Sequence, residues 1–317
     1  MRYRRLGDSG LRVSAVSFGT WLTAGNTIDR EGTDALVRTA LDCGINLLDT
    51  ADVYARGAAE DVLGLVIAGI PRHTLVLATK AFFPMSEEPN DRGLSRKHLF
   101  ESLHKSLKRL RTDYVDLFQC HRPDPEVPLH ETCRAMDDLV RQGKTLYWGI
   151  SMWPAQRITE AVELCHREGW QPPISNQPCY NLLDRSIEAE VLPASEAAGV
   201  GQIVFSPLAQ GVLSGKYRPG AKPPQDSRLA DDRVNKFIGR FLAGDALNRV
   251  ARMGEIAARL GVSHSQLALA FCLRFESIAS VIVGATKVEQ LRDNAAAAAL
   301  ELDAETLAEL DVLFPRG

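Results

Sequence analysis

The chain has 317 residues, of which 45% are hydrophobic and 24% are charged, an ordinary composition for a globular protein. Its formal net charge of -3 gives no bulk electrostatic reason to expect nucleic acid or an anionic membrane as a partner. No apolar run approaches the ~20 residues needed to span a bilayer, and no apolar signal region follows the basic start. The six cysteines are scattered, without a C-x-x-C pair. We therefore expect a reduced, cytoplasmic protein with no membrane insertion.

Strand and helix patterns alternate along the chain after Trp21, which is typical of parallel β/α units. The expected strands are Val13–Gly19, Ile45–Asp49, Thr74–Thr79, Tyr114–Cys120, Thr145–Ile150, Ile174–Gln177, Gln202–Phe205 and Ser280–Val283. The helices expected between them begin near Asp29, Ala58, Ser95, Leu129, Pro154, Asp184, Asp245, Ser263 and Val288. The helix from Asp184 is expected to reach Ala198, and the one from Ser263 to open with a capping box of Ser263 and Gln266.

Eight such units favour one closed (β/α)8 TIM barrel, with residues 1–317 as a single domain. Length alone also allows two average domains, but no linker, repeat or low-complexity stretch supports a second one. The stretch Tyr3–Ser14 predicts an N-terminal β-hairpin that plugs one end of the barrel, and the residues after Asp303 predict an extra C-terminal helix. The long polar segment Gly211–Gly244 interrupts the alternation, and a loop of that length is uncommon unless it is functional.

Ionisable side chains gather at the ends of three successive strands. Asp49, Lys80 and His121 each end an apolar run, and Tyr54 follows Asp49 within one loop. In a (β/α)8 barrel these positions meet at the carboxyl-terminal mouth, where active sites lie. The set suits protonation of a carbonyl oxygen: a nearby Lys80 would lower the pKa of the Tyr54 phenol, and Asp49 would hold Lys80 charged.

Structural explanations compete with this one. A lone Asp–Lys pair is more often a structural ion pair, and a single His at a strand end is more often structural than functional. Asp52 and Asp124 lie nearby in sequence, and we interpret both as solvated loop acids. Four complementary groups at three successive strand ends nevertheless favour a functional site.

The motif Gly44-Ile45-Asn46-Leu47-Leu48-Asp49-Thr50-Ala51-Asp52-Val53-Tyr54, with Lys80 and His121, resembles the signature of the aldo-keto reductase superfamily, and the match extends over the whole chain. The resemblance implies NADPH-dependent reduction of an aldehyde or ketone. By the same motif, Tyr54 would be the general acid, Lys80 its pKa partner, Asp49 the anchor of Lys80 and His121 the donor that orients the substrate.

Segments in the second half imply a site for NADP(H). Ser151 and Gln177 match the residues that bind the nicotinamide carboxamide, and Phe205 in Phe205-Ser206-Pro207-Leu208 matches the aromatic that stacks on the ring. Gly284–Asn294 resembles the stretch that binds the 2′-phosphate and adenine, and a helix N-terminus is a ready anion site. The full set of expected cofactor residues is Thr20, Ser151, Gln177, Phe205, Ser206, Leu208, Gly211, Ser214, Lys216, Arg228, Gly284, Thr286, Lys287, Gln290, Asp293 and Asn294. Thr286 and Glu289 also fit a simple capping box, which is compatible with phosphate binding.

The sequence departs from the common aldo-keto reductase pattern at two places. Ser151-Met152 stands where many members have Ser-Asn, so one carboxamide contact is missing or supplied otherwise. The long segment, with Gly-Val-Leu-Ser-Gly-Lys-Tyr at Gly211–Tyr217, resembles the branch that includes potassium-channel β-subunits and related bacterial reductases. That branch often assembles as tetramers, so a homo-oligomer is implied.

Other functions stay open on the sequence. The main alternative is an NADP(H)-binding regulatory protein with slow turnover, which would keep the same four residues. A more distant one is a metal-dependent barrel hydrolase using His121 and Asp49. The substrate is undefined, and Trp21, Phe82, Phe83 and Trp153 are candidate apolar walls of its pocket.

Overall fold

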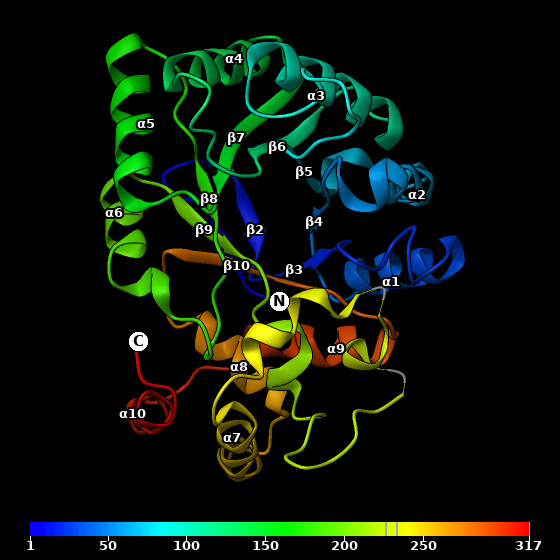
Figure 1. The fold of residues 1–317 in the computed structure, drawn as a ribbon, viewed down its shortest axis with the longest axis vertical. Coiled ribbons are helices and arrows are strands. Elements are labelled where there is room, and N and C mark those ends of the chain that lie inside the picture. Colours follow the sequence, from blue (N-terminus) through cyan, green and yellow to red (C-terminus); the bar gives the residue numbers. More distant parts are fainter. Residues whose placement is uncertain (226, 233, 317) are drawn as a thin grey trace.

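The computed structural model describes residues 1–225, 227–232 and 234–316. Within these residues, eight parallel strands close into a barrel surrounded by helices (Figure 1). The barrel strands are β3 (Val16–Gly19), β4 (Leu47–Asp49), β5 (Val76–Ala81), β6 (Val115–Cys120), β7 (Thr145–Ser151), β8 (Ser175–Gln177), β9 (Gly201–Val204) and β10 (Ile278–Val283). Neighbours in sequence pair in order, and β10 closes the ring by pairing with β3. The predicted (β/α)8 barrel is confirmed.

The helices cover the outside of the barrel because each strand is followed by a crossover that must return to start the next parallel strand. Their bounds are α1 (Arg30–Asp42), α2 (Ala58–Ile67), α3 (Arg96–Leu110), α4 (Leu129–Arg141), α5 (Ala155–Glu168), α6 (Val191–Ala197), α7 (Ala246–Leu260), α8 (His264–Cys272), α9 (Val288–Ala296) and α10 (Ala304–Leu313). Every residue of β5, β6 and β10 is buried, as expected for strands covered on both faces.

An antiparallel hairpin, β1 (Tyr3–Arg5) and β2 (Arg12–Ser14), closes the amino end of the barrel. Leu6 and Val13 pack against barrel side chains, and Arg4 donates hydrogen bonds to the carbonyls of Phe275 and Ile278, at the start of β10. In Figure 1, β2 lies across the middle of the ring of strands. The hairpin was predicted, but Val13 pairs with Arg4 and therefore belongs to it rather than to the first barrel strand.

Helix starts follow the capping residues. Asp29 accepts from the N–H of Gly32 at the start of α1, and the predicted capping box of Ser263 and Gln266 opens α8. The helix expected from Asp184 is shorter than predicted. Asn181 and Asp184 exchange backbone hydrogen bonds, which turns the chain, and a short 3-10 helix precedes α6 at Val191.

Described residues of the segment 211–244 line the cavity at the carboxyl end of the barrel. The described residues of this segment form only short 3-10 turns, at Ala209–Ser214, Arg228–Ala230, Asn235–Phe237 and Gly239–Phe241. The Phe237 ring packs against Trp21, which follows β3, with ring centroids 5.2 Å apart. Among the described helices, none has the length and apolarity required to cross a membrane.

Candidate active site

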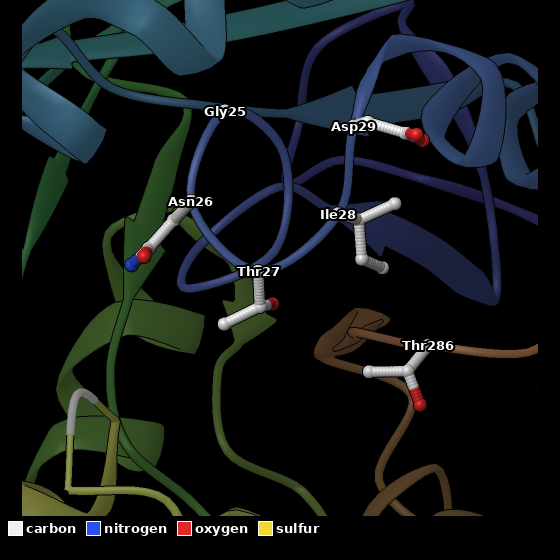
Figure 2. Close-up of a pocket in the computed structure, with 6 residues that line it drawn as sticks. All are labelled: Gly25, Asn26, Thr27, Ile28, Asp29 and Thr286. Atoms are coloured by element: carbon white, nitrogen blue, oxygen red, sulfur yellow. The ribbon is translucent and has the colours of Figure 1, made fainter.

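A cavity of about 1430 Å³ opens at the carboxyl ends of the barrel strands. Its wall includes Asp49 from the end of β4, Ser151 from β7 and Gln177 from β8, together with Tyr54 and His121 from the loops after β4 and β6. A second pocket of about 690 Å³ adjoins it, where the loop Gly25–Asp29 faces Thr286 (Figure 2). Asn26, Thr27, Ile28 and Thr286 line both pockets, so the two lie side by side; together they are called the hollow.

A chain of hydrogen bonds joins three of the four predicted catalytic residues. The Lys80 ammonium is fully buried and donates to Asp49 Oδ2 at 2.6 Å, to the carbonyl of Thr50 at 2.8 Å and to the Tyr54 hydroxyl at 3.3 Å. These three acceptors use the three protons of the ammonium. Lys80 lies within β5 and does not line the cavity, so it acts there only through Tyr54.

The protonation states follow from burial and from this pairing. Burial alone would lower the pKa of Lys80, but Asp49 and Tyr54 outweigh burial and raise it, which keeps the ammonium charged. Burial raises the pKa of Tyr54, and the Lys80 cation opposes that effect without overcoming it. The predicted net lowering of the Tyr54 pKa is therefore wrong for the free site. The phenol holds its proton at neutral pH.

His121 packs beside Tyr54 at the same mouth. Its ring centroid lies 5.8 Å from that of Tyr54 and 4.9 Å from that of Phe83, both in edge-to-face geometry. Burial, helped by the Lys80 and Arg122 cations, holds the pKa of His121 well below its usual value. Its buried Nδ1 has no hydrogen-bond partner among the described residues. The imidazole is therefore neutral and keeps one N–H to donate.

Backbone strain is concentrated around this cavity. Eight non-glycine residues among those described have positive φ, and five of them line it, namely Leu22, Ala55, Met152, Ser206 and Gln210. Ala55 and Arg56, with φ of 48° and 53°, follow Tyr54 directly and set the sharp turn that presents it. Strained residues of this kind persist only where the surrounding structure holds them, and they cluster at functional sites.

The predicted cofactor residues come together along the same hollow, with one exception. Fifteen line the cavity: Ser151, Gln177, Phe205, Ser206, Leu208, Gly211, Ser214, Lys216, Arg228, Gly284, Thr286, Lys287, Gln290, Asp293 and Asn294. Thr20 is buried outside the wall, where its hydroxyl bonds to Thr50 Oγ1 and to the carbonyl of Asp49.

Several of these side chains already have partners within the protein. Asp293 accepts hydrogen bonds from Ser263 and Gln266, which fastens α9 to the start of α8. Gln290 Oε1 accepts from the backbone N–H of Thr286 at 3.0 Å. The predicted capping box of Thr286 and Glu289 is therefore wrong: α9 begins at Val288, and its N-cap Lys287 makes no side-chain capping bond.

The model of the aldo/keto reductase family matches residues 15–314. The chain belongs to the aldo/keto reductase family. It is 46% identical over 297 residues to a protein from Oryza sativa subsp. japonica named a probable voltage-gated potassium channel subunit beta, covering 93% of this chain and 90% of that protein.

Two further relatives have similar names. A probable voltage-gated potassium channel subunit beta from Arabidopsis thaliana is 44% identical over 297 residues, covering 93% of this chain and 90% of that protein. A putative voltage-gated potassium channel subunit beta from Schizosaccharomyces pombe is 41% identical over 322 residues, covering 98% of this chain and 93% of that protein. The predicted resemblance to this branch of the family is confirmed.

The pocket of this member of the aldo/keto reductase family contains residues that the sequence motifs did not indicate. Arg122, Gln210 and Phe237 line the cavity, and so do Asn26, Thr27 and Ile28 of the loop before α1. Of the expected apolar walls, Trp21 and Phe83 line the cavity, whereas Phe82 and Trp153 do not. In the sequence, the only signal for Arg122 was its position directly after His121.

Asp52 also differs from its expected role. It is fully buried behind the site, where Ser102 donates to its Oδ2 at 2.7 Å, so the prediction of a solvated acid is wrong. Burial raises its pKa to about 7, with a smaller contribution from Glu60. Asp124 is half-buried and accepts the backbone N–H groups of Leu94 and Glu126. Among the described residues, no group of three or more His, Cys, Asp and Glu side chains is arranged to hold a metal ion.

Proposed function

We propose that the protein is an NADPH-dependent reductase that converts an aldehyde or ketone to an alcohol. The observation that carries this proposal is the buried hydrogen-bonded chain Asp49–Lys80–Tyr54, which ends on a phenol at the wall of a large cavity. Membership of the aldo/keto reductase family supports an oxidoreductase.

Tyr54 is the proposed general acid. Because burial raises its pKa, the phenol carries the proton that a reduced carbonyl oxygen needs. The Lys80 ammonium, 3.3 Å from the hydroxyl, then stabilises the tyrosinate that remains. The neutral His121 donates a hydrogen bond to the same oxygen and fixes its position.

The residues of the hollow fit a phosphorylated dinucleotide. The N-cap of α9 is Lys287, whose ammonium has no acceptor for the first-turn N–H groups of the helix, and a helix N-terminus next to a cation favours an anion. Lys287 and Arg228 would hold the 2′-phosphate that distinguishes NADPH from NADH, while Phe205, Ser151 and Gln177 would hold the nicotinamide. The bound cofactor supplies the hydride.

The test is multiple-turnover oxidation of NADPH by the purified protein with a panel of aldehydes and ketones. We expect many turnovers per site, and we expect Tyr54→Phe to lose roughly 10²- to 10⁴-fold in kcat/KM, the usual contribution of a general acid. The variant should bind NADPH as the wild type does. Near-normal turnover in Tyr54→Phe would remove this residue from the acid role.

A regulatory function is the second candidate, because three relatives are named as probable or putative voltage-gated potassium channel β-subunits. In that case the protein would bind NADP(H), turn over slowly and act on a partner protein. Stoichiometric oxidation of bound NADPH without further turnover across the panel would favour it. In either case we propose a cytoplasmic protein that assembles as a homo-oligomer.

A further inference from the structure

A cationic side chain stands beside the proposed reacting groups. Arg122 follows His121 directly and lines the cavity. Its Nη1 donates to the carbonyl of His121 at 2.5 Å and reaches Ser151 Oγ at 3.5 Å. The centre of the guanidinium lies 5.3 Å from the centroid of the Phe83 ring. These contacts hold the charged group at the cavity wall.

The described residues do not neutralise the charge of Arg122. In the described part of the chain, no carboxylate forms an ion pair with it, whereas the buried Arg185 and the half-buried Arg109 face Glu188 and Glu60. Among the described residues, Nε and Nη2 of Arg122 also find no acceptor. A partly desolvated cation without an anion is costly, unless a ligand supplies one.

Apolar side chains also line this part of the cavity. Trp21, Phe83, Met152 and Phe237 line it around Tyr54 and His121. Met152 and Phe237 keep 39% and 49% of their surface exposed, so apolar area is available to a ligand. A guanidinium with two unused donors beside aromatic walls matches a planar carboxylate on an apolar body.

We propose that Arg122 binds a carboxylate of the carbonyl substrate, so that the enzyme prefers aromatic or otherwise apolar aldehydes and ketones that carry one. This inference rests on the proposed reductase function and names its substrate class. Arg122 would be a specificity-determining residue, acting on a part of the substrate that does not react.

The test compares matched substrates. The 3- and 4-carboxybenzaldehydes are each paired with their methyl ester, and the ratio of kcat/KM for acid over ester is measured for each pair. We expect the larger of the two wild-type ratios to fall roughly 10- to 100-fold in Arg122→Gln, because a charge-assisted bidentate contact is lost. Arg122→Lys keeps the positive charge but cannot form the bidentate contact with a carboxylate. It should therefore give an intermediate ratio.

Arg240→Gln is the control, because Arg240 lines the same cavity but already faces Asp184 at 4.0 Å. Its ratio should stay at the wild-type value. NADPH affinity, followed by fluorescence titration, should be unchanged in Arg122→Gln. An unchanged ratio in Arg122→Gln would overturn the proposal, and weaker NADPH binding with an unchanged ratio would assign Arg122 to the nucleotide instead.

A separate measurement distinguishes failure of this proposal from failure of the reductase function. If the wild type reduces none of the four aldehydes, the reductase proposal fails, and calorimetric titration with benzoate and benzamide, with and without NADP⁺, tests Arg122 directly. Benzoate binding that is lost in Arg122→Gln supports the carboxylate site. Equal benzoate binding by both proteins overturns it.

Discussion

Gln177 Nε2 donates a hydrogen bond to Asp49 Oδ1 at 2.9 Å, across the barrel from β8 to β4. The other carboxylate oxygen of Asp49 accepts from Lys80 at 2.6 Å. The residue expected to hold the nicotinamide therefore also positions the anion that anchors Lys80. We therefore expect cofactor binding and the protonation of Tyr54 to be coupled through this one carboxylate.

Gln177→Met should reduce both stability and NADPH affinity. The variant keeps the shape of the side chain but leaves Asp49 Oδ1 without its donor, which should cost about 1–3 kcal/mol in the free energy of unfolding. Urea denaturation measures the first effect and fluorescence titration the second.

Gln202→Met is the matched control. Gln202 is a buried glutamine on the neighbouring strand that bonds to Asn176 and lies outside the cavity wall. It should lower stability alone. Equal NADPH affinity in the two variants would contradict the coupling.

Removing Asp49 alone should lower the free energy of unfolding more than replacing both Asp49 and Lys80 with apolar residues. Asp49→Leu leaves the fully buried Lys80 ammonium without its anion, and we expect a loss of about 3–5 kcal/mol in the free energy of unfolding. The double variant Asp49→Leu/Lys80→Met should recover much of this loss while carbonyl reduction stays abolished. Thermal and urea unfolding of the single and double variants measure the difference. A double variant no more stable than Asp49→Leu would show that the buried charge is not the cause.

Asp52 should make the protein less stable as pH rises towards 7. Burial raises the folded-state pKa of its carboxyl to about 7, above the unfolded value of 3.8. Between these values the folded state holds a proton that the unfolded state has lost, so unfolding becomes easier with increasing pH. The total change is about 4 kcal/mol. Asp52→Asn should flatten stability over pH 4–7, as measured by urea unfolding at several pH values. An unaltered pH profile in the variant would exclude Asp52 as its source.

Glu188 should have the opposite pH dependence. Burial alone would raise its pKa, but hydrogen bonds from Arg185 and Tyr180 and the Arg274 cation outweigh burial and hold it at about 2, below the unfolded value of 4.5. The stabilisation that ionised Glu188 gives the folded state is complete above pH 4.5 and is lost as the pH falls towards 2. Glu188→Gln should reduce stability at pH 7 and shrink the loss seen on acidification. Unfolding midpoints at pH 7 and pH 3 test this, with the exposed Glu168→Gln as a control that should change neither.

The barrel and its mouth could be predicted from the sequence because both depend on local patterns. Alternating strand and helix patterns determine the β/α order, and residues that end parallel strands meet at one mouth whatever the loops do. Asp49, Tyr54 and His121 were located in this way. Helix starts at Asp29 and Ser263 were also predictable, since a cap acts within three residues.

The features that escaped prediction depend on contacts between distant segments. Whether Lys80 lowers the Tyr54 pKa depends on how completely the phenol is buried, which the motif does not reveal. In the sequence Asp52 resembles a solvated loop acid. In the structure Ser102 on α3 packs against it and donates a hydrogen bond to its carboxylate. The position of Arg122 depends on its contacts with Phe83 and Ser151, which belong to other segments of the chain.

The hairpin also determines how the protein can be handled. Tyr3 reaches the carbonyl of Gly44 and Arg4 reaches those of Phe275 and Ile278, so β1 is fastened to the amino ends of the barrel strands. Met1 is exposed next to it, whereas the cavity opens at the carboxyl ends. An affinity tag or a surface linker attached at Met1 therefore lies on the far side of the barrel from the mouth. Immobilised protein oriented this way keeps the mouth of its pocket accessible to added ligands.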